Sequence, residues 1–285
     1  MLLKDFSPHQ GLQEFVKCYR IVHFKFNKNE LPPFKPYTPR PENCLAFYPH
    51  DTERIEYAAS GKKISNLPIA LIGQHLEVTN RYIGQEFLVI QIIFQPGALY
   101  RLTGIPLMEL IDEYLEADCV FAKDIKFVNE QFHHAQNYSE MVTIANQFVG
   151  KLVKKGVKDS HPLDEVCKLM LKHDGAISLD WLARESCLSI KQFERKFKDR
   201  TGVNPKLFGR LIRFDNAFRT KNANPQLDWL SVAIDCHYYD YQHLVRDYKT
   251  FTGVTPNAFH TLNTPEGTLG MAEQFYEIET LNLRM

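Results

Sequence analysis

The sequence lacks the short motifs that mark most enzymes and metal sites. Its 285 residues include six cysteines, but no two of them stand at C-x-x-C spacing, which argues against a zinc ribbon, a redox motif and a disulfide framework. A glycine-rich phosphate loop, a nucleophile elbow and an H-E-x-x-H helix are also missing. The pairs His133-His134 and Cys236-His237 have no companion ligands at metal spacing. We therefore expect no enzyme activity, no catalytic residue, no metal and no cofactor.

Net charge and long apolar runs are absent as well. Lysine plus arginine number 34, and so do aspartate plus glutamate, whereas a non-specific nucleic-acid coat usually shows itself in net charge. No apolar run reaches the length of a membrane span, and Lys4 and Asp5 come too early for a signal peptide. We expect a cytoplasmic protein without a membrane partner. Its length and its 44% hydrophobic content are enough for two cores.

The feature that is present is an internal repeat in the last third of the chain. Residues 193–205 recur in register at 244–256, with apolar residues, Arg, Lys, Gly, Val and Pro at matching places. Chance similarity rarely holds its register through a helix, its glycine stop and the proline start of the next helix. The pattern therefore indicates a duplicated helical unit.

Each copy has the signals of a helix, a tight turn and a second helix. In the first copy, Ala183 lets two helices cross closely, Ser189 and Gln192 form a predicted capping box, and Gly202 ends the second helix. Pro205 then starts another helix. The second copy repeats this plan at Ala233, Asp240, Gly253 and Pro256. Both copies predict a helix-turn-helix unit.

These residues resemble the AraC/XylS family of transcription regulators. The resemblance covers about residues 162–260; segment 237–256 looks like the family signature, and 212–217 is similar to the helix that links the two units. The family usually has glycine four residues after the small alanine, where this chain has Cys187 and His237. A left-handed backbone there carries a Cβ penalty for any residue but glycine. We expect both turns to be somewhat strained.

Two basic helices of this kind imply DNA as the partner, because a helix fits the major groove and its side chains can read base edges. Carried over by matching position, the base-reading residues of the family fall on Lys191, Gln192, Arg195, Tyr241, Gln242 and Arg246. Lys198 and Lys249 add positive charge for phosphates. The first helix carries five basic residues against two acidic ones, while Asp240 and Asp247 offset the second. We expect the first unit to supply most of the affinity.

A linking helix from Pro205 to about Thr220 sets the separation of the two units. At about 1.5 Å per residue it spans about 24 Å. With the width of the flanking helices, this approaches the roughly 34 Å between successive major-groove faces. Both units of one chain can therefore read one face of the duplex.

The first 130 residues predict a mostly-β domain. Strand patterns occupy 19–26, 45–48, 69–72 and 87–94, and several short strands favour a barrel or a sandwich. The proline-rich stretch 31–41 predicts a loop or lid without regular structure.

Residues 95–110 are similar to the sensor-like domain of one AraC subgroup, which implies a regulatory role and leaves the ligand open. A concave apolar pocket is the usual form of a small-molecule site. Phe47, Tyr48 and Phe94 are candidates for its lining, although plain core is the simpler interpretation of each. The apolar stripe along 139–155 predicts a helix that packs on its own domain or pairs with a second chain.

The sequence thus predicts an α+β protein, with a mostly-β sensor-like domain (barrel or sandwich with helices) followed by an all-α domain with two helix-turn-helix units. The predicted parts are a regulatory domain at 1–135, a helix and linker at 136–160, the DNA-binding domain at 161–262 and a tail at 263–285. The predicted function is sequence-specific regulation of transcription, controlled by an effector or by dimerisation. Candidate partners are double-stranded DNA, a small-molecule effector, a second copy of the chain and RNA polymerase.

Two alternatives remain. The first is a DNA-repair or other enzyme that borrows an AraC-type DNA-binding domain, which needs a reactive cysteine. The second is a sensor or partner-binding protein whose DNA-binding domain is degenerate, and the two missing turn glycines keep it open.

Overall fold

Two antiparallel sheets form the first part of the chain in the computed structural model, which describes residues 2–27, 32, 35–121, 123–156, 158 and 160–262. The predicted tail at 263–285 lies outside the described residues. The first sheet has the order β1-β2-β9-β4-β7-β10, and the second has the order β3-β8-β5-β6. Their bounds are β1 Leu2–Phe6, β2 Val16–Lys25, β3 Lys35–Tyr37, β4 Cys44–Phe47, β5 Arg54–Tyr57, β6 Lys63–Ile64, β7 Ile69–Ile72, β8 Thr79–Tyr82, β9 Glu86–Phe94 and β10 Tyr114–Glu116.

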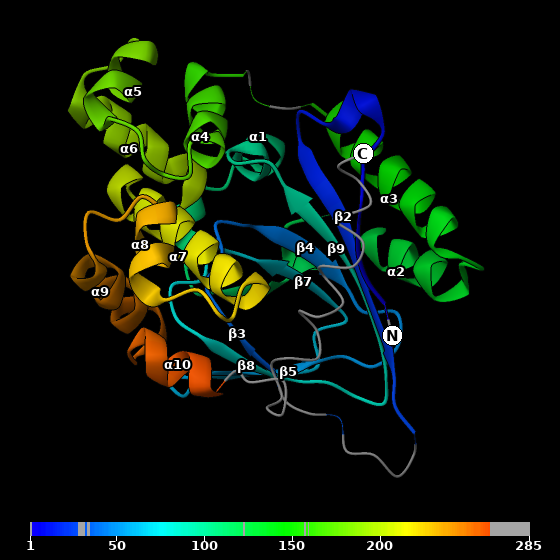
Figure 1. Cartoon of the computed structure of the whole chain (residues 1–285). Helices are drawn as coiled ribbons and strands as arrows, with labels where there is room; N and C mark the ends of the chain where they lie inside the picture. Colours follow the sequence, from blue (N-terminus) through cyan, green and yellow to red (C-terminus); the bar gives the residue numbers. More distant parts are fainter. Residues whose placement is uncertain are drawn as a thin grey trace.

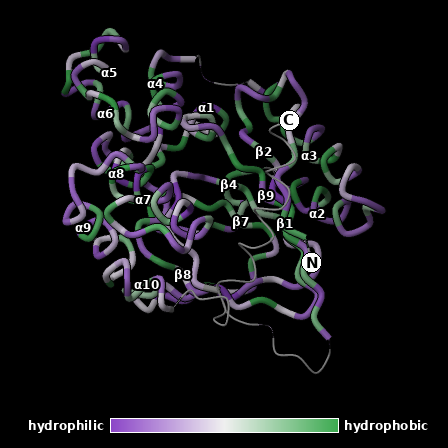
Figure 2. The backbone as a smooth tube through the Cα atoms, in the orientation of Figure 1, coloured by the Kyte–Doolittle hydropathy of each residue, from purple (hydrophilic) through white to green (hydrophobic). Residues whose placement is uncertain are grey.

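The four strands predicted from the sequence are confirmed as parts of β2, β4, β7 and β9. Strand β9 lies inside the first sheet and is buried on both faces, because Ile90 and Ile92 point to one side while Phe87 and Val89 point to the other. A strand covered on both faces reads as an almost continuous hydrophobic run rather than an alternation. Figure 2 shows the same hydrophobic stretches at the centre of the molecule.

The proline-rich stretch corrects one prediction. Residues Lys35–Tyr37 form β3, which pairs antiparallel with β8, so this stretch contains regular structure. The reason is its place at the edge of the second sheet, where Pro36 is tolerated because an edge strand does not need every N–H for pairing. Residues 31, 33 and 34 lie outside the described residues.

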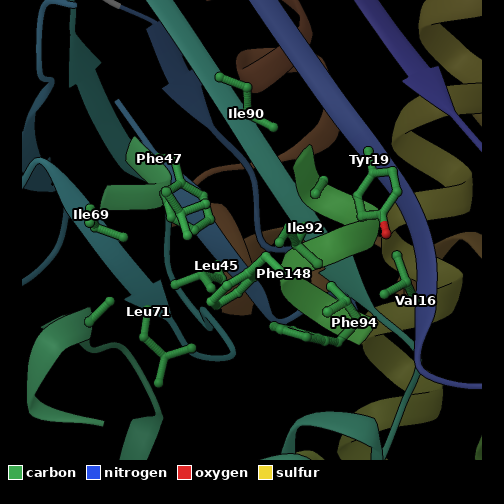
Figure 3. Close-up of a cluster of buried hydrophobic side chains, with 14 of the residues drawn as sticks. Val16, Tyr19, Leu45, Phe47, Ile69, Leu71, Ile90, Ile92, Phe94 and Phe148 are labelled. Atoms are coloured by element: carbon green, nitrogen blue, oxygen red, sulfur yellow. The ribbon is translucent and has the colours of Figure 1, made fainter. Parts of the chain in front are cut away.

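Short helices cover the outer face of the first sheet. They are three 3₁₀ helices, η1 Gln10–Leu12, η2 Leu107–Leu110 and η3 Ala117–Cys119, and the α-helices α1 Ala98–Thr103, α2 Ile125–His134 and α3 Tyr138–Lys154. The apolar stripe of α3 packs on its own domain, with the Phe148 ring 5.8 Å from that of Phe47. Figure 3 shows this core, to which Phe94 also belongs. Phe47 and Phe94 are therefore core residues, and Tyr48 is buried in a second core cluster with residues of both sheets, such as Ile55 and Ile93.

The second part of the chain is helical and lies against the edge of the sheets (Figure 1). Its helices are α4 Pro162–Lys172, α5 Leu179–Glu185, α6 Ile190–Thr201, α7 Pro205–Ala223, α8 Trp229–Asp235, α9 Tyr241–Thr252 and α10 Pro256–Leu262. They form two apolar cores, one around α4, α5 and α6 and one around α8, α9 and α10. Helix α7 contributes to both.

Candidate nucleic-acid interface

The first helix-turn-helix unit consists of α5 and α6. Ala183 is 2% exposed, so α5 crosses close to its neighbours. The predicted capping box is present: Ser189 Oγ accepts from Gln192 N at 3.4 Å, and Gln192 Oε1 accepts from Ser189 N at 3.3 Å. Gly202 ends α6 with a φ of 89°. The local signals in the sequence therefore place both ends of this helix.

The second unit, α8 and α9, follows the same plan. Asp240 caps α9 by accepting from His243 N at 2.8 Å, and the backbone hydrogen bond from His243 lowers the pKa of the Asp240 carboxyl. An ionised carboxylate at the positive end of the helix is the favourable arrangement. Gly253 ends α9 with a φ of 79°.

Both turns contain the left-handed residue that the sequence predicts. Cys187 has a φ of 53° and His237 a φ of 60°. In the first turn Leu188 N donates to Ala183 O at 3.1 Å, and in the second Tyr238 N donates to Ala233 O at 2.9 Å. This bond from the residue after the left-handed one, back over five residues, is the Schellman motif. The two turns therefore keep the glycine geometry without glycine.

The outward side of α6 carries four of the predicted contact residues. Lys191, Gln192, Arg195 and Lys198 are all exposed. The other two basic residues of this helix point elsewhere. Lys196 Nζ lies 3.2 Å from His161 Nε2, and Arg200 is buried.

The outward side of α9 carries Gln242, Arg246 and Lys249, which are also exposed. Tyr241 is only half exposed, because it packs against the core of its own unit. Asp247 is 5% exposed and accepts from Arg210 Nε of α7 at 2.8 Å. This acidic residue therefore faces away from the outward side of α9. The net charge summed over all residues of α9 is consequently less positive than the charge on its exposed side.

Two exposed apolar residues at the leading ends of these helices were missed by the sequence analysis. Ile190 is the first residue of α6 and is 54% exposed, while Tyr239, two residues before α9, is 91% exposed. An apolar side chain at or just before the start of each helix is only a weak signal for an exposed contact residue, because apolar residues in these helices usually pack in the core.

Helix α7 joins the two units. Its 19 residues span about 28 Å at about 1.5 Å per residue, slightly more than the sequence predicts. Phe208 and Ile212 pack in the core of the first unit, and Phe214 and Phe218 pack in that of the second. Figure 1 shows both units on the side of the molecule that faces away from α2 and α3.

The first unit is anchored to the N-terminal part by a buried ionic contact. Arg200 Nε donates to Asp164 Oδ1 at 3.0 Å, and the Arg200 guanidinium lies 4.8 Å from the centre of the Tyr100 ring. Arg101 Nε is 4.0 Å from Asp164 Oδ2. All three charged side chains are at least nine-tenths buried. The sequence gives no signal for this contact, because its members come from three distant segments.

Four of the six cysteines are buried, and Cys119 and Cys187 are exposed. Burial raises the pKa of the Cys44 thiol to about 12 and also raises those of Cys18, Cys167 and Cys236. Within residues 2–262 as far as the structure describes them, no group of three or more His, Cys, Asp or Glu side chains could hold a metal ion. Among the same residues, no helix is long and apolar enough to cross a membrane.

Family comparisons match two stretches of the chain. Residues 182–261 match a family model described as a helix-turn-helix domain, and residues 4–116 match a domain of unknown function, DUF6597. No curated protein matches the chain.

Several solved structures are similar. ToxT from Vibrio cholerae has 13% identity and a TM-score of 0.47, over 86% of this chain and 99% of that chain. A ToxT structure with bound unsaturated fatty acid has 11% identity and a TM-score of 0.43, over 85% and 93%. The DNA-binding domain of the global transcriptional factor AdpA, in complex with a target DNA, has 25% identity and a TM-score of 0.35, over 38% and 100%.

Two helix-turn-helix units stand in tandem on one shared linking helix, and the matching domain model spans the second helix pair completely. Together with the residues at 237–256 that resemble the family signature, these features make residues 182–261 a DNA-binding helix-turn-helix domain of the AraC/XylS type.

Proposed function

We propose that the chain reads duplex DNA in a sequence-specific way with α6 and α9, and that its N-terminal part controls this reading in response to a small-molecule effector. The observation that carries the proposal is the matching exposure of polar side chains on the two helices. Lys191, Gln192 and Arg195 on α6 are exposed, and so are Gln242 and Arg246 on α9, whereas Tyr241 is partly covered.

Each side chain has a role that follows from its chemistry. Arg195 and Arg246 suit bidentate contacts to guanine, and Gln192 and Gln242 suit adenine. Lys198 and Lys249 lie further along each helix and neutralise phosphates. Ile190 and Tyr239 add apolar contacts at the leading ends, for example to a thymine methyl group.

The proposed parts are regulatory at 1–135, a helix and linker at 136–160, DNA-binding at 161–262 and a tail at 263–285. The packing of α3 in the N-terminal core supports counting that helix with the regulatory part. The connection that links the two functions then begins after Lys154.

Buried polar side chains on β8 and on the chain segments beside it support effector control. Five of them each bury a nitrogen or oxygen atom that has no hydrogen-bond partner within the described residues: Thr38, Gln74, His75, Thr79 and Arg81. Buried polar groups normally find partners, so such a concentration calls for a ligand or ordered water. Burial lowers the pKa of His75, which keeps its ring neutral and able to accept as well as donate.

DNA binding is tested with the full-length protein. A site selected from random duplexes is titrated by fluorescence anisotropy at several salt concentrations, with a scrambled duplex as control. We expect a preference for the selected site and an affinity whose logarithm falls linearly with the logarithm of salt. Equal affinity for the scrambled duplex would leave the second alternative, a degenerate DNA-binding domain, in place.

Effector control is tested by thermal melts against a metabolite library. A compound that raises the melting temperature of the wild type binds the folded state. Thr79→Val keeps the shape of the buried side chain but removes its hydroxyl, and should reduce the shift; Thr143→Val on the exposed side of α3 is the matched control. If the compound raises the melting temperature of Thr79→Val as much as that of the wild type, the effector binds at another site.

A second copy of the chain is a further proposed partner. Phe127 on α2 is 60% exposed beside a hollow of about 320 Å³ between α2 and α3, and exposed apolar patches often mark interfaces. Sedimentation of Phe127→Ser beside the wild type tests it: a dimer that persists in the variant would exclude this face. Contact with RNA polymerase stays a prediction from the family resemblance.

A further inference from the structure

Six residues of the N-terminal part reach the cores of both DNA-reading units. We call residues 73–78, which connect β7 to β8, the bridging segment. Leu76 packs against the core of the first unit, which includes Phe193 and Phe197. Val78 is 5% exposed and belongs to the core of the second unit with Phe214. Since these two side chains are two positions apart, one short segment contacts both units.

The backbone of the bridging segment is fixed by its neighbours. Gly73 N donates to Glu113 O at 3.1 Å, and Asp112 N donates back to Gln74 O at 3.0 Å. Leu76 N donates to Asp112 Oδ1 at 2.8 Å. A connection whose N–H and C=O groups are paired in this way has lost most of the freedom of a surface loop.

Close packing holds the segment at both ends. A Cβ atom on Gly73 would lie 1.7 Å from Leu110 O, so the chain passes directly against η2, and η2 in turn contacts α6. The Glu77 carboxylate accepts from the backbone N–H groups of Ala59 and Ser60 at 2.7 and 3.2 Å. The segment is therefore a rigid support rather than a tether.

The same segment is connected to the linking helix. Gln74 Nε2 donates to Arg40 O at 2.6 Å. Arg40 Nε lies 3.8 Å from Asp215 Oδ1 of α7, and both side chains are at least nine-tenths buried. A displacement of the bridging segment would thus reach α7 and both units together.

We infer that the bridging segment positions α6 relative to α9, so that the N-terminal part sets the spacing between the two DNA half-sites that one chain accepts. This rests on the proposed function, in which both units read DNA. Helix α7 alone joins the units at one place, and long helices curve and flex. Leu76 and Val78 connect the two units a second time through the bridging segment, and this second connection restricts the flexing of α7.

The spacing of the half-sites gives a direct readout. One inserted base pair moves a half-site by about 3.4 Å and turns it by about 34° around the duplex axis. Two rigidly related helices cannot follow both changes. We expect the full-length wild type to bind a selected site at least about tenfold more tightly than the same site with one base pair inserted between the half-sites.

Val78→Ala should shrink this ratio to about threefold or less, because it removes packing contacts while changing no residue of α6 or α9. Leu76→Ala should act in the same direction through the first unit. Val149→Ala is the matched control: Val149 is fully buried on α3 and belongs to the N-terminal core rather than to the core of either unit. It should destabilise the fold and leave the ratio unchanged.

Melting curves accompany each titration, and Leu76→Ala, whose side chain is only partly buried, carries the test if Val78→Ala does not fold. A ratio in the Val78 and Leu76 variants equal to that of the wild type overturns the inference. So does a wild type that binds both spacings equally well. Failure of the proposed function has a different signature, namely no preference of the wild type for the selected site over a scrambled duplex.

Discussion

The two helix-turn-helix units share a backbone plan but use their charges differently. In the first unit, α6 turns Lys196 and Arg200 inward, where Arg200 anchors the unit to Asp164 and Tyr100. In the second unit, α9 turns an acidic residue inward, and Asp247 pairs with Arg210 of α7. The first helix thus presents less positive charge than its sequence total, and the second presents more. The net charge of a helix, counted from its sequence, is therefore a poor measure of the charge on its exposed side.

The largest expected difference between the units concerns their anchors. Asp164→Ala leaves Arg200 and Arg101 buried without their shared carboxylate, and should cost about 3 kcal/mol or more of unfolding free energy. Asp247→Ala should cost about 1 kcal/mol, because its partner Arg210 is partly exposed and regains water. Urea titrations of both variants measure this. Equal losses of unfolding free energy would mean that the two ionic contacts contribute equally to stability.

The arginines that we propose to contact DNA test the balance of the two helices. Arg195→Ala should cost about 1 to 3 kcal/mol of binding free energy and relax specificity at one base pair. The sequence predicts a smaller loss for Arg246→Ala. With Asp247 facing inward, we now expect a comparable one. Anisotropy titrations against single-base variants of the selected site would compare them, and a tenfold gap in favour of Arg195 would restore the ranking from the sequence.

The two turns should gain stability from glycine by different amounts. Cys187→Gly relieves a left-handed Cβ penalty, and after the extra chain entropy of glycine a net gain of about 0.5 to 1 kcal/mol remains. His237→Gly should gain less, because His237 Nε2 lies 3.9 Å from Asp174 Oδ2 and this contact is lost. Thermal melts decide. A clear loss of stability in Cys187→Gly would show that packing contacts of the Cys187 side chain stabilise the fold.

The smallest expected effects are those of the two lysines that we propose to contact phosphates. Lys198→Ala and Lys249→Ala should each weaken binding to all sequences alike and lower the slope of log affinity against log salt by about 1. The two variants should behave as a matched pair. A change of base preference in either would assign that lysine to base reading instead.

Local features of the fold could be predicted well. The caps at Ser189 and Asp240, the glycine stops and the left-handed turns at Cys187 and His237 all depend on a few neighbouring residues. The four predicted strands have the same local origin. These signals are sufficient to place the helices that carry the candidate site.

Contacts between distant segments could not be predicted. Nothing near Asp247 in the sequence indicates that it faces Arg210, and nothing near Val78 indicates that it completes a core built from residues beyond 210. The strand at Lys35–Tyr37 escaped for the same reason, since only its partner β8 and its edge position make it a strand. Such packing decides which side of each helix is exposed and therefore available to a partner.

The shared helix α7 has a consequence for how the duplicated units change over time. Phe208 and Ile212 serve one core while Phe214 and Phe218 serve the other, so a substitution on α7 must satisfy two structures at once. The exposed residues of α6 and α9 are not constrained by two cores in this way. Each unit can therefore acquire its own DNA sequence preference, while the helix between them keeps the geometry of the two units related and makes them unfold together.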